Sequence, residues 1–162
     1  MSHLLNMKIR SSRGFTAIEM IIVLVIISVL SAMAVPSFLQ WRQSLEARET
    51  AMDFVNILRK AKSDAINTNR QQQVQFDATL KHYGQRQGSQ TNTNWATASA
   101  VASWTNLKSE VFFTPSVNVE FNPNGTSTVN SIVTSATITV QNNAATRTFT
   151  VSVASTGRIS MQ

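Results

Sequence analysis

The longest hydrophobic stretch of the chain lies near its N-terminus. From Met20 to Trp41 there are 22 consecutive residues without charge, MIIVLVIISVLSAMAVPSFLQW. A helix of this length is about 33 Å long, because each residue adds about 1.5 Å, and a bilayer core needs about 20 apolar residues. The part from Met20 to Val35 is apolar on every face, as membrane helices are. We therefore predict a transmembrane helix.

Beyond Pro36 the pattern remains helical but becomes one-sided. Charged residues alternate with an apolar stripe that recurs at steps of three to seven positions: Leu45, Met52, Val55, Leu58, Ala61 and Ala65, widened by Phe54 and Ile66. This period predicts an amphipathic helix that packs with one face. We expect one long helix from about Phe15 to Asn69, with a bend at Pro36 because proline interrupts the helical hydrogen bonding.

After Asn69 the period changes to two, which predicts β-strands. Alternating or short apolar runs occur at 73–77, 111–113, 117–121, 137–140, 148–153 and 158–161. The runs 137–140 and 148–153 predict a hairpin with the inward residues Ile138, Val140, Phe149, Val151 and Val153. The fold class is therefore α+β, a long N-terminal α-helix, transmembrane in its first half, packed on an antiparallel β-sheet domain.

The segment 82–106 departs from this pattern. It is rich in Gln, Ser, Thr, Asn and Ala, and it contains Trp95 and Trp104. A stretch of this length predicts a long exposed loop or a functional insertion. Since large aromatic side chains usually bury, we expect the two tryptophans to attach the loop to the domain rather than to bind a ligand.

Composition argues against an enzyme. The chain has 162 residues, enough for one modest domain plus an appendage, with no cysteine and two distant histidines, His3 and His82. These counts leave no thiolate nucleophile and no residue cluster typical of a zinc site. The sequence also lacks a Gly-x-Ser-x-Gly elbow and a glycine-rich phosphate loop. We expect no catalytic residue, no cofactor, no metal and no small-molecule substrate.

A basic leader precedes the apolar stretch. Met1 to Gly14 carries Lys8, Arg10 and Arg13, and these charges would hold the N-terminus in the cytoplasm with the rest of the chain on the far side. A secretory signal peptide has the same order of basic and apolar segments. Glu19 argues against it, because a charge is poorly tolerated at the start of such an apolar run.

The residues around Gly14 carry a family resemblance. Residues 13–20, Arg-Gly-Phe-Thr-Ala-Ile-Glu-Met, resemble the class III signal of type IV pilins and pseudopilins. The resemblance implies that a prepilin peptidase cuts between Gly14 and Phe15 and methylates the Phe15 amine, so that Glu19 becomes the fifth mature residue. Pro36 falls where many pilins have a helix-bending proline.

This resemblance implies an organisation for the whole chain. Residues 1–14 are the leader peptide, residues 15–41 the transmembrane and filament-core helix, and residues 42–162 a periplasmic domain of amphipathic helix and β-sheet. The chain would cross the bacterial inner membrane once and would then be extracted into a pilus or pseudopilus. Its implied partners are the prepilin peptidase, other pilin or pseudopilin subunits and the membrane.

Glu19 has two explanations at this point. The Phe15 amine of one subunit and the Glu19 carboxylate of its neighbour could neutralise each other in a filament, where an unpaired charge costs several kcal/mol. Alternatively, Glu19 caps the start of its own helix, where the helix dipole favours a negative charge. The two explanations are compatible.

Three segments beyond the membrane helix are similar to the GspH/FimT family. They are the helix end Leu-Arg-Lys-Ala-Lys-Ser-Asp-Ala-Ile-Asn-Thr-Asn at 58–69, the turn at 121–125, and the closing segment at 151–159 with its Gly-Arg turn. Lys62 replaces the usual arginine and Asp64 the usual glutamate. The family groups a type II secretion pseudopilin with a minor type IV pilin used in DNA uptake.

The resemblance therefore leaves two roles open. The first is a structural filament subunit. The second is DNA binding, which DNA-uptake members perform through a basic Gly-Arg-x-Arg tail, whereas Gly157-Arg158-Ile159-Ser160 lacks the second arginine. Arg147 and Arg158 would add phosphate contacts if they met across neighbouring strands. Against this stands the scattered charge of residues 42–162, whose eleven basic and seven acidic residues give +4, typical of solvated surface charge.

Overall fold

The computed structural model describes residues 14–91, 93–130, 132, 135–142 and 147–162. The chain divides into two compact units, 1–39 and 40–162. The described part of the first unit consists of residues 14–16 and the first half of helix α1 (Ala17–Thr68). The second unit contains the second half of α1 and all nine strands found in the described residues.

Helix α1 agrees with the predicted helix to within two residues at each end. It is followed directly by a left-handed residue, Asn69, with φ of 51°, and the Arg70 N–H donates to the Ala65 carbonyl at 3.3 Å. This geometry is a Schellman motif, which satisfies a carbonyl that the helix end would otherwise leave free. The asparagine thus explains why the helix stops before β1.

The buried stripe of α1 is rotated slightly from the predicted one. Met52 and Ile66 are 39% and 49% exposed, and Leu45 is only half-buried. The stripe shifts because the sheets cover the face that carries Ala47, Thr50, Ala51, Phe54, Val55, Leu58, Ala61 and Ala65. These residues follow steps of three and four positions, as one helix face requires.

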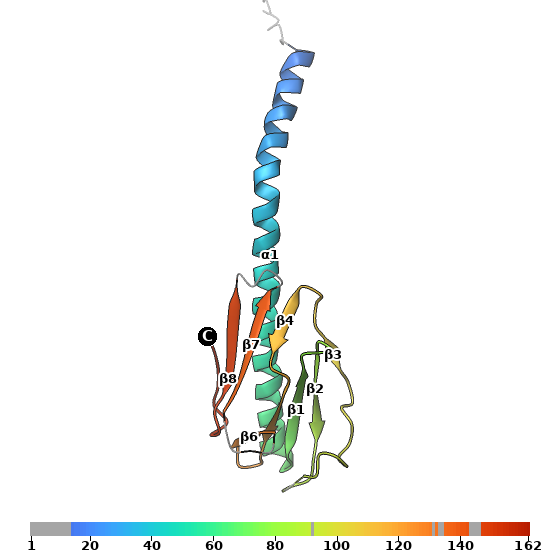
Figure 1. The fold of residues 1–162 in the computed structure, drawn as a ribbon, viewed down its shortest axis with the longest axis vertical. Helices are drawn as coiled ribbons and strands as arrows, with labels where there is room; N and C mark the ends of the chain where they lie inside the picture. The colour runs from blue at the N-terminus through green and yellow to red at the C-terminus, as the bar shows by residue number, and fades with distance from the viewer. Residues whose placement is uncertain (1–13, 92, 131, 133–134, 143–146) are drawn as a thin grey trace, which may run out of the picture. The chain divides into compact units, whose positions relative to one another are not determined.

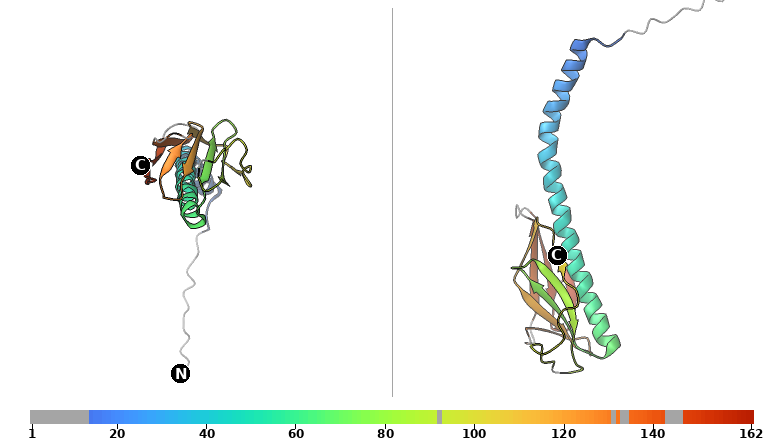
Figure 2. Two further views of the ribbon diagram at one scale, coloured as in Figure 1. Left: turned by 90° about the horizontal axis from the view of Figure 1, so that it is seen from below. Right: turned by 90° about the vertical axis from the view of Figure 1, so that its right-hand side faces the viewer.

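The strands form two antiparallel sheets rather than one. The first sheet has the order β3 (Thr105–Asn106), β2 (His82–Gln87), β1 (Gln72–Asp77), β5 (Val117–Phe121) and β6 (Ser127–Val129). The second has the order β4 (Val111–Thr114), β7 (Ala136–Asn142), β8 (Thr148–Val153) and β9 (Ile159–Met161). Figures 1 and 2 show the strands of both sheets along the second half of α1. The arrangement confirms the predicted α+β class.

The prediction of a loop over residues 82–106 is wrong at both ends of this segment. Residues 82–87 form β2, which pairs with β1 in a register that places Asp77 opposite His82, and Thr105–Asn106 forms β3. The connection without regular strands is therefore the shorter stretch 88–104, with residue 92 outside the described residues. The predicted hairpin of β7 and β8 is present, although Phe149 is only half-buried at the edge of the core.

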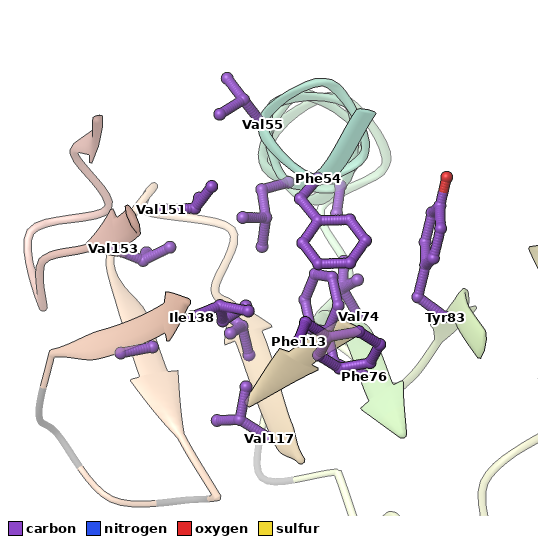
Figure 3. Close-up of a cluster of buried hydrophobic side chains, with 14 of the residues drawn as sticks. Phe54, Val55, Val74, Phe76, Tyr83, Phe113, Val117, Ile138, Val151 and Val153 are labelled. Carbon is purple, nitrogen blue, oxygen red and sulfur yellow. The ribbon is translucent and has the colours of Figure 1, made fainter. Parts of the chain in front are cut away.

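The core of the second unit centres on Phe54 of α1. Figure 3 shows its ring among aromatic side chains from the strands. The ring centroid of Phe54 lies 4.8 Å from Phe76, 5.0 Å from Tyr83 and 5.2 Å from Phe113, in edge-to-face contacts. This geometry is favourable for aromatic pairs. The helix is thereby fixed to both sheets, since Phe76 lies on β1 and Phe113 on β4.

Candidate processing and assembly site

The start of α1 is closed by a reciprocal cap between Thr16 and Glu19. The backbone N–H and the hydroxyl of Thr16 both donate to Glu19 Oε2, each at 2.8 Å. The Glu19 backbone N–H donates in return to Thr16 Oγ1 at 3.3 Å. This Thr-x-x-Glu arrangement is a capping box, which satisfies N–H groups that a helix start leaves unpaired. Of the two explanations for Glu19, the structure shows the cap.

The cap leaves part of the carboxylate available. Glu19 Oε1 accepts no hydrogen bond from the described residues, and Glu19 is exposed. Phe15 lies one residue before the capping threonine and is 80% exposed. The capping role and a second, intermolecular role for Glu19 are therefore compatible in geometry, because they use different oxygens.

Gly14 is not required by the local structure. A Cβ built on Gly14 meets no heavy atom within 4 Å, and its φ lies outside the left-handed region that favours glycine. A side chain at this position would thus leave the fold unchanged. The described structure therefore gives no reason of its own for a glycine at this position.

The described part of the first unit exposes its apolar side chains all round. Every residue from Gly14 to Leu39 is exposed, including Leu24 at 62%, Leu30 at 62% and Met33 at 74%. Among the described residues, α1 is the one helix long and apolar enough to cross a membrane. Such a surface is stable only when lipid or other helices cover it. Pro36 lies inside α1, and the bend there stays a prediction.

In the second unit, the three segments singled out in the sequence meet at one junction. Lys62 on α1 donates from Nζ to the Gly157 carbonyl at 3.0 Å. Gly125 and Gly157 both have left-handed backbones, with φ of 82° and 76°. A Cβ at Gly157 would collide with the Gly125 carbonyl oxygen. Glycine at 157 therefore serves both the turn and the close approach of two loops.

Replacing Gly157 with alanine is expected to lower the free energy of unfolding by about 2–4 kcal/mol, from backbone strain and steric overlap together. Gly125→Ala is the matched control, since a Cβ there meets only Lys62 and Ile66 side-chain atoms at 3.5 and 3.6 Å. It should lose only about 1–2 kcal/mol. Denaturant unfolding of the full chain in micelles measures both. Equal losses would contradict the close approach.

Arg147 and Arg158 do not meet across neighbouring strands, so that expectation is wrong. Arg147 precedes β8, and β9 pairs with β8 so that Val153 lies opposite Ile159. The Ala154 N–H donates to the Arg158 carbonyl at 2.9 Å, which places Arg158 beside the other end of β8. Arg158 lies beside Ala154, seven residue steps along the chain from Arg147, and at about 3.3 Å a step this separates the two arginines by about 23 Å.

A row of buried polar side chains that was not predicted from the sequence crosses the first sheet. Gln73 donates to Glu120 Oε1 at 2.9 Å and accepts from Arg86 Nε at 2.7 Å, while the Thr128 hydroxyl donates to Glu120 Oε2 at 2.9 Å. Gln73 and Glu120 are only 2% and 4% exposed. Burial lowers the pKa of the Arg86 guanidinium, and the Glu120 carboxylate partly restores it. The row joins four strands and stabilises their register.

The row also holds the connection 88–104 on the sheet. Arg86 Nη1 donates to the Trp95 carbonyl at 2.9 Å, and the guanidinium lies 5.0 Å from the centre of the Trp95 ring. Trp104 packs against His82 with ring centroids 4.0 Å apart and the rings tilted by 36°. Both tryptophans therefore attach this connection to β2, as predicted, although Trp104 is not buried and remains 42% exposed. In the sequence, the polar residues of β1 and β5 only alternate with apolar ones along the strands. This alternation does not show whether a polar side chain is buried or exposed.

Comparisons with known proteins agree with this geometry. The family model described as Type II transport protein GspH matches residues 50–157, and that of the prokaryotic N-terminal methylation motif matches residues 9–35. No curated protein matches the chain in sequence.

Solved structures with a similar fold include two filament proteins. The type IV minor pilin FimU of Pseudomonas aeruginosa is 18% identical over 71% of this chain and 91% of its own, with a TM-score of 0.54. The minor pseudopilin EpsH from the type 2 secretion system of Vibrio cholerae is 17% identical over 72% of this chain and 96% of its own, also with a TM-score of 0.54. At these identities the likeness is one of fold. The family model covers most of the chain, and the chain therefore belongs to the GspH family, within the superfamily of type IV pilins and pseudopilins.

Proposed function

We propose that this protein is a minor pilin or pseudopilin, a non-catalytic subunit of a type II secretion pseudopilus or a type IV pilus. The observation that carries the proposal is the Gly14-Phe15 motif set directly before a capped helix with uncovered apolar faces. That helix continues into the folded unit that the GspH model matches. A chain built in this way has both a processing signal and a surface for helix packing.

In this proposal the chain is first inserted into the membrane and processed, and then assembled into a filament. The basic leader first orients the chain in the inner membrane, with its N-terminus in the cytoplasm and residues 42–162 in the periplasm. Prepilin peptidase then removes residues 1–14 and methylates Phe15. The mature helix 15–41 passes from lipid into the core of the filament, where other pilin or pseudopilin helices cover its apolar side chains.

In this proposal, Glu19 determines how neighbouring helices are aligned along the filament. After cleavage the Phe15 amine is a positive charge close to the capping box, and Glu19 Oε1 is open to an amine from a neighbouring subunit. A carboxylate in a bundle of apolar helices is stabilised only with a partner, because water is absent there. Subunits that place amine and carboxylate together are therefore favoured over those in other registers.

A photo-crosslinker at Leu24 tests the packing of the helix. Leu24 is 62% exposed on α1, and the side chain should face neighbouring helices once the subunit joins a filament. We expect ultraviolet light to join the chain to a pilin-type subunit in cells that assemble filaments, and mass spectrometry to identify the partner. The matched control carries the same crosslinker in a Glu19→Ala chain, which should yield few adducts. Adducts with lipid alone in both chains would contradict the proposal.

DNA binding during uptake is the alternative role, and it has less support. The net charge of +4 on residues 42–162 attracts a polyanion weakly. A DNA site normally gathers its basic residues on one face, whereas Arg147 and Arg158 lie at opposite ends of β8. The structural role needs no such cluster, and it is the role we propose.

A further inference from the structure

The face of the first sheet that points away from α1 carries cross-strand rows of polar side chains. Strand residues alternate between the two faces, and Val74, Phe76 and Tyr83 occupy the inner one. The pairing of β2, β1 and β5 then places Gly84, Gln75 and Asn118 in one row on the outer face. This row contains amides and a glycine, with no charged residue among the three.

A pocket of about 340 Å³ opens on this row. Six of the residues that line it carry the chemistry: Gln75, Asp77, Trp104, Ser116, Asn118 and Asn130. Its volume lies within the range of small-molecule sites, about 300–1,000 Å³. The pocket is distinct from the processing motif and from the helix, because none of the residues that line it belongs to α1 or to residues 14–16.

Trp104 forms one wall of the pocket because two residues of β2, His82 and Gly84, let it pack closely on the strand. Its ring packs against the His82 ring at an angle of 36°, and a Cβ added to Gly84 would lie 3.3 Å from Trp104 Cε3 and collide with Val101. The missing side chain at Gly84 thus lets this segment rest directly on the strand. Trp104 remains 42% exposed, so that an aromatic surface is held in place beside polar groups.

Several polar groups in the pocket have unused hydrogen-bonding capacity. The Asn118 side chain makes no hydrogen bond to any described residue, although its backbone N–H donates to Asn130 Oδ1 at 3.1 Å. Gln75 uses its amide nitrogen to donate to Gln73 at 3.1 Å, which leaves its oxygen as an acceptor. Asp77 Oδ1 accepts from the Thr79 and Leu80 N–H groups, while Oδ2 is 3.9 Å from His82 Nε2. Donors and acceptors therefore lie side by side.

We propose that this pocket binds a neutral saccharide. Side-chain amides present both donors and acceptors, as sugar hydroxyls do, so each matches the other. An indole surface suits the apolar C–H face of a sugar ring. No described residue that lines the pocket is a lysine or arginine, and Asp77 adds negative charge, which disfavours phosphate and nucleic acid.

Titration of oligosaccharides into the full-length chain in lipid nanodiscs tests the proposal. Nanodiscs are needed because maltoside detergents would themselves present a sugar. The probes are maltotetraose and the β-1,4-linked tetramer of N-acetylglucosamine, followed by calorimetry. We expect at least one to bind with a Kd of about 1 mM or tighter. Trp104→Ala and Asn118→Ala should each weaken binding about tenfold or more, while Trp95→Phe, outside the pocket, should leave it unchanged.

The Asn118→Ala variant should fold normally, because the Asn118 side chain makes no hydrogen bond to the described residues. A loss of binding in this variant therefore reports on the pocket and not on misfolding. A single-stranded oligonucleotide is titrated in parallel at two salt concentrations. Failure of both oligosaccharides to bind would overturn the proposal, as would binding that both pocket variants leave intact. Binding of the oligonucleotide alone, lost in Trp104→Ala, would instead assign the pocket to nucleic acid and would also overturn it.

Discussion

Glu19→Ala is expected to leave cleavage at Gly14 intact but to lower incorporation into filaments about tenfold or more. The substitution removes the carboxylate that we propose pairs with the Phe15 amine of a neighbouring subunit. That amine would then enter the apolar helix bundle unpaired, at a cost of several kcal/mol, and about 1.4 kcal/mol already changes an equilibrium tenfold. The ratio of chain in sheared filaments to chain in membranes measures the effect.

Two further variants separate charge pairing from helix capping. Glu19→Gln keeps an acceptor for the Thr16 N–H and hydroxyl but carries no charge, so it should assemble as poorly as Glu19→Ala. Thr16→Val removes the hydroxyl from the cap and keeps the carboxylate, so it should assemble nearly normally. Normal assembly of Glu19→Gln, or loss of assembly in Thr16→Val alone, would show that the cap is what matters.

Gly14→Leu is expected to abolish removal of the leader. A Cβ at this position meets nothing within 4 Å, so the change leaves the helix start and its cap intact. The loss would therefore report recognition by the peptidase and not misfolding. The uncleaved chain should stay in the membrane fraction with residues 1–14 attached, detected as a larger mass on immunoblot.

Gly14→Ala is the control for that experiment, since it adds the smallest side chain at the same site. It should be processed at a reduced rate, between the original chain and Gly14→Leu. Correct processing of Gly14→Leu at the original rate would overturn the assignment of the cleavage site. It would leave the fold of residues 40–162 and the family membership untouched, because these rest on other residues.

The elements that could be predicted from sequence are those with a strong local pattern. Helix α1 and the β7–β8 hairpin were found because their apolar residues repeat every three to four or every two positions. Strand β2 was missed because His82–Gln87 reads HYGQRQ, with one large apolar side chain, Tyr83. It is a strand because β1 pairs with it along six residues, and pairing partners are not visible in a local window.

The exact buried face of α1 also depends on tertiary contacts. Thr50 was left out of the predicted stripe because it is polar, yet it is buried and its hydroxyl donates to the Glu46 carbonyl at 3.0 Å. Met52 was included because it is apolar, yet the sheets leave it 39% exposed. Polarity alone does not reveal that a hydroxyl is satisfied within its own helix.

The candidate sites also differ in whether a local sequence pattern could reveal them. The motif at Gly14, Phe15 and Glu19 is contiguous in sequence, so it was found directly, whereas the role of Thr16 in the cap required coordinates. The prediction that Arg147 and Arg158 lie close together was wrong because β9 pairs with the C-terminal half of β8, whereas Arg147 precedes its N-terminal end. The pocket at Trp104 combines β1, β5 and a distant connection, and no sequence spacing indicates such a combination.

The intact mass of the chain recovered from sheared filaments tests both its processing and its assembly. We expect a chain that begins at Phe15 and carries one methyl group on its amine. A chain in filaments that retains residues 1–14, or that begins at another residue, would contradict the proposed processing. A chain that is cleaved but never found in filaments, from cells that assemble them, would contradict the proposed role as a filament subunit.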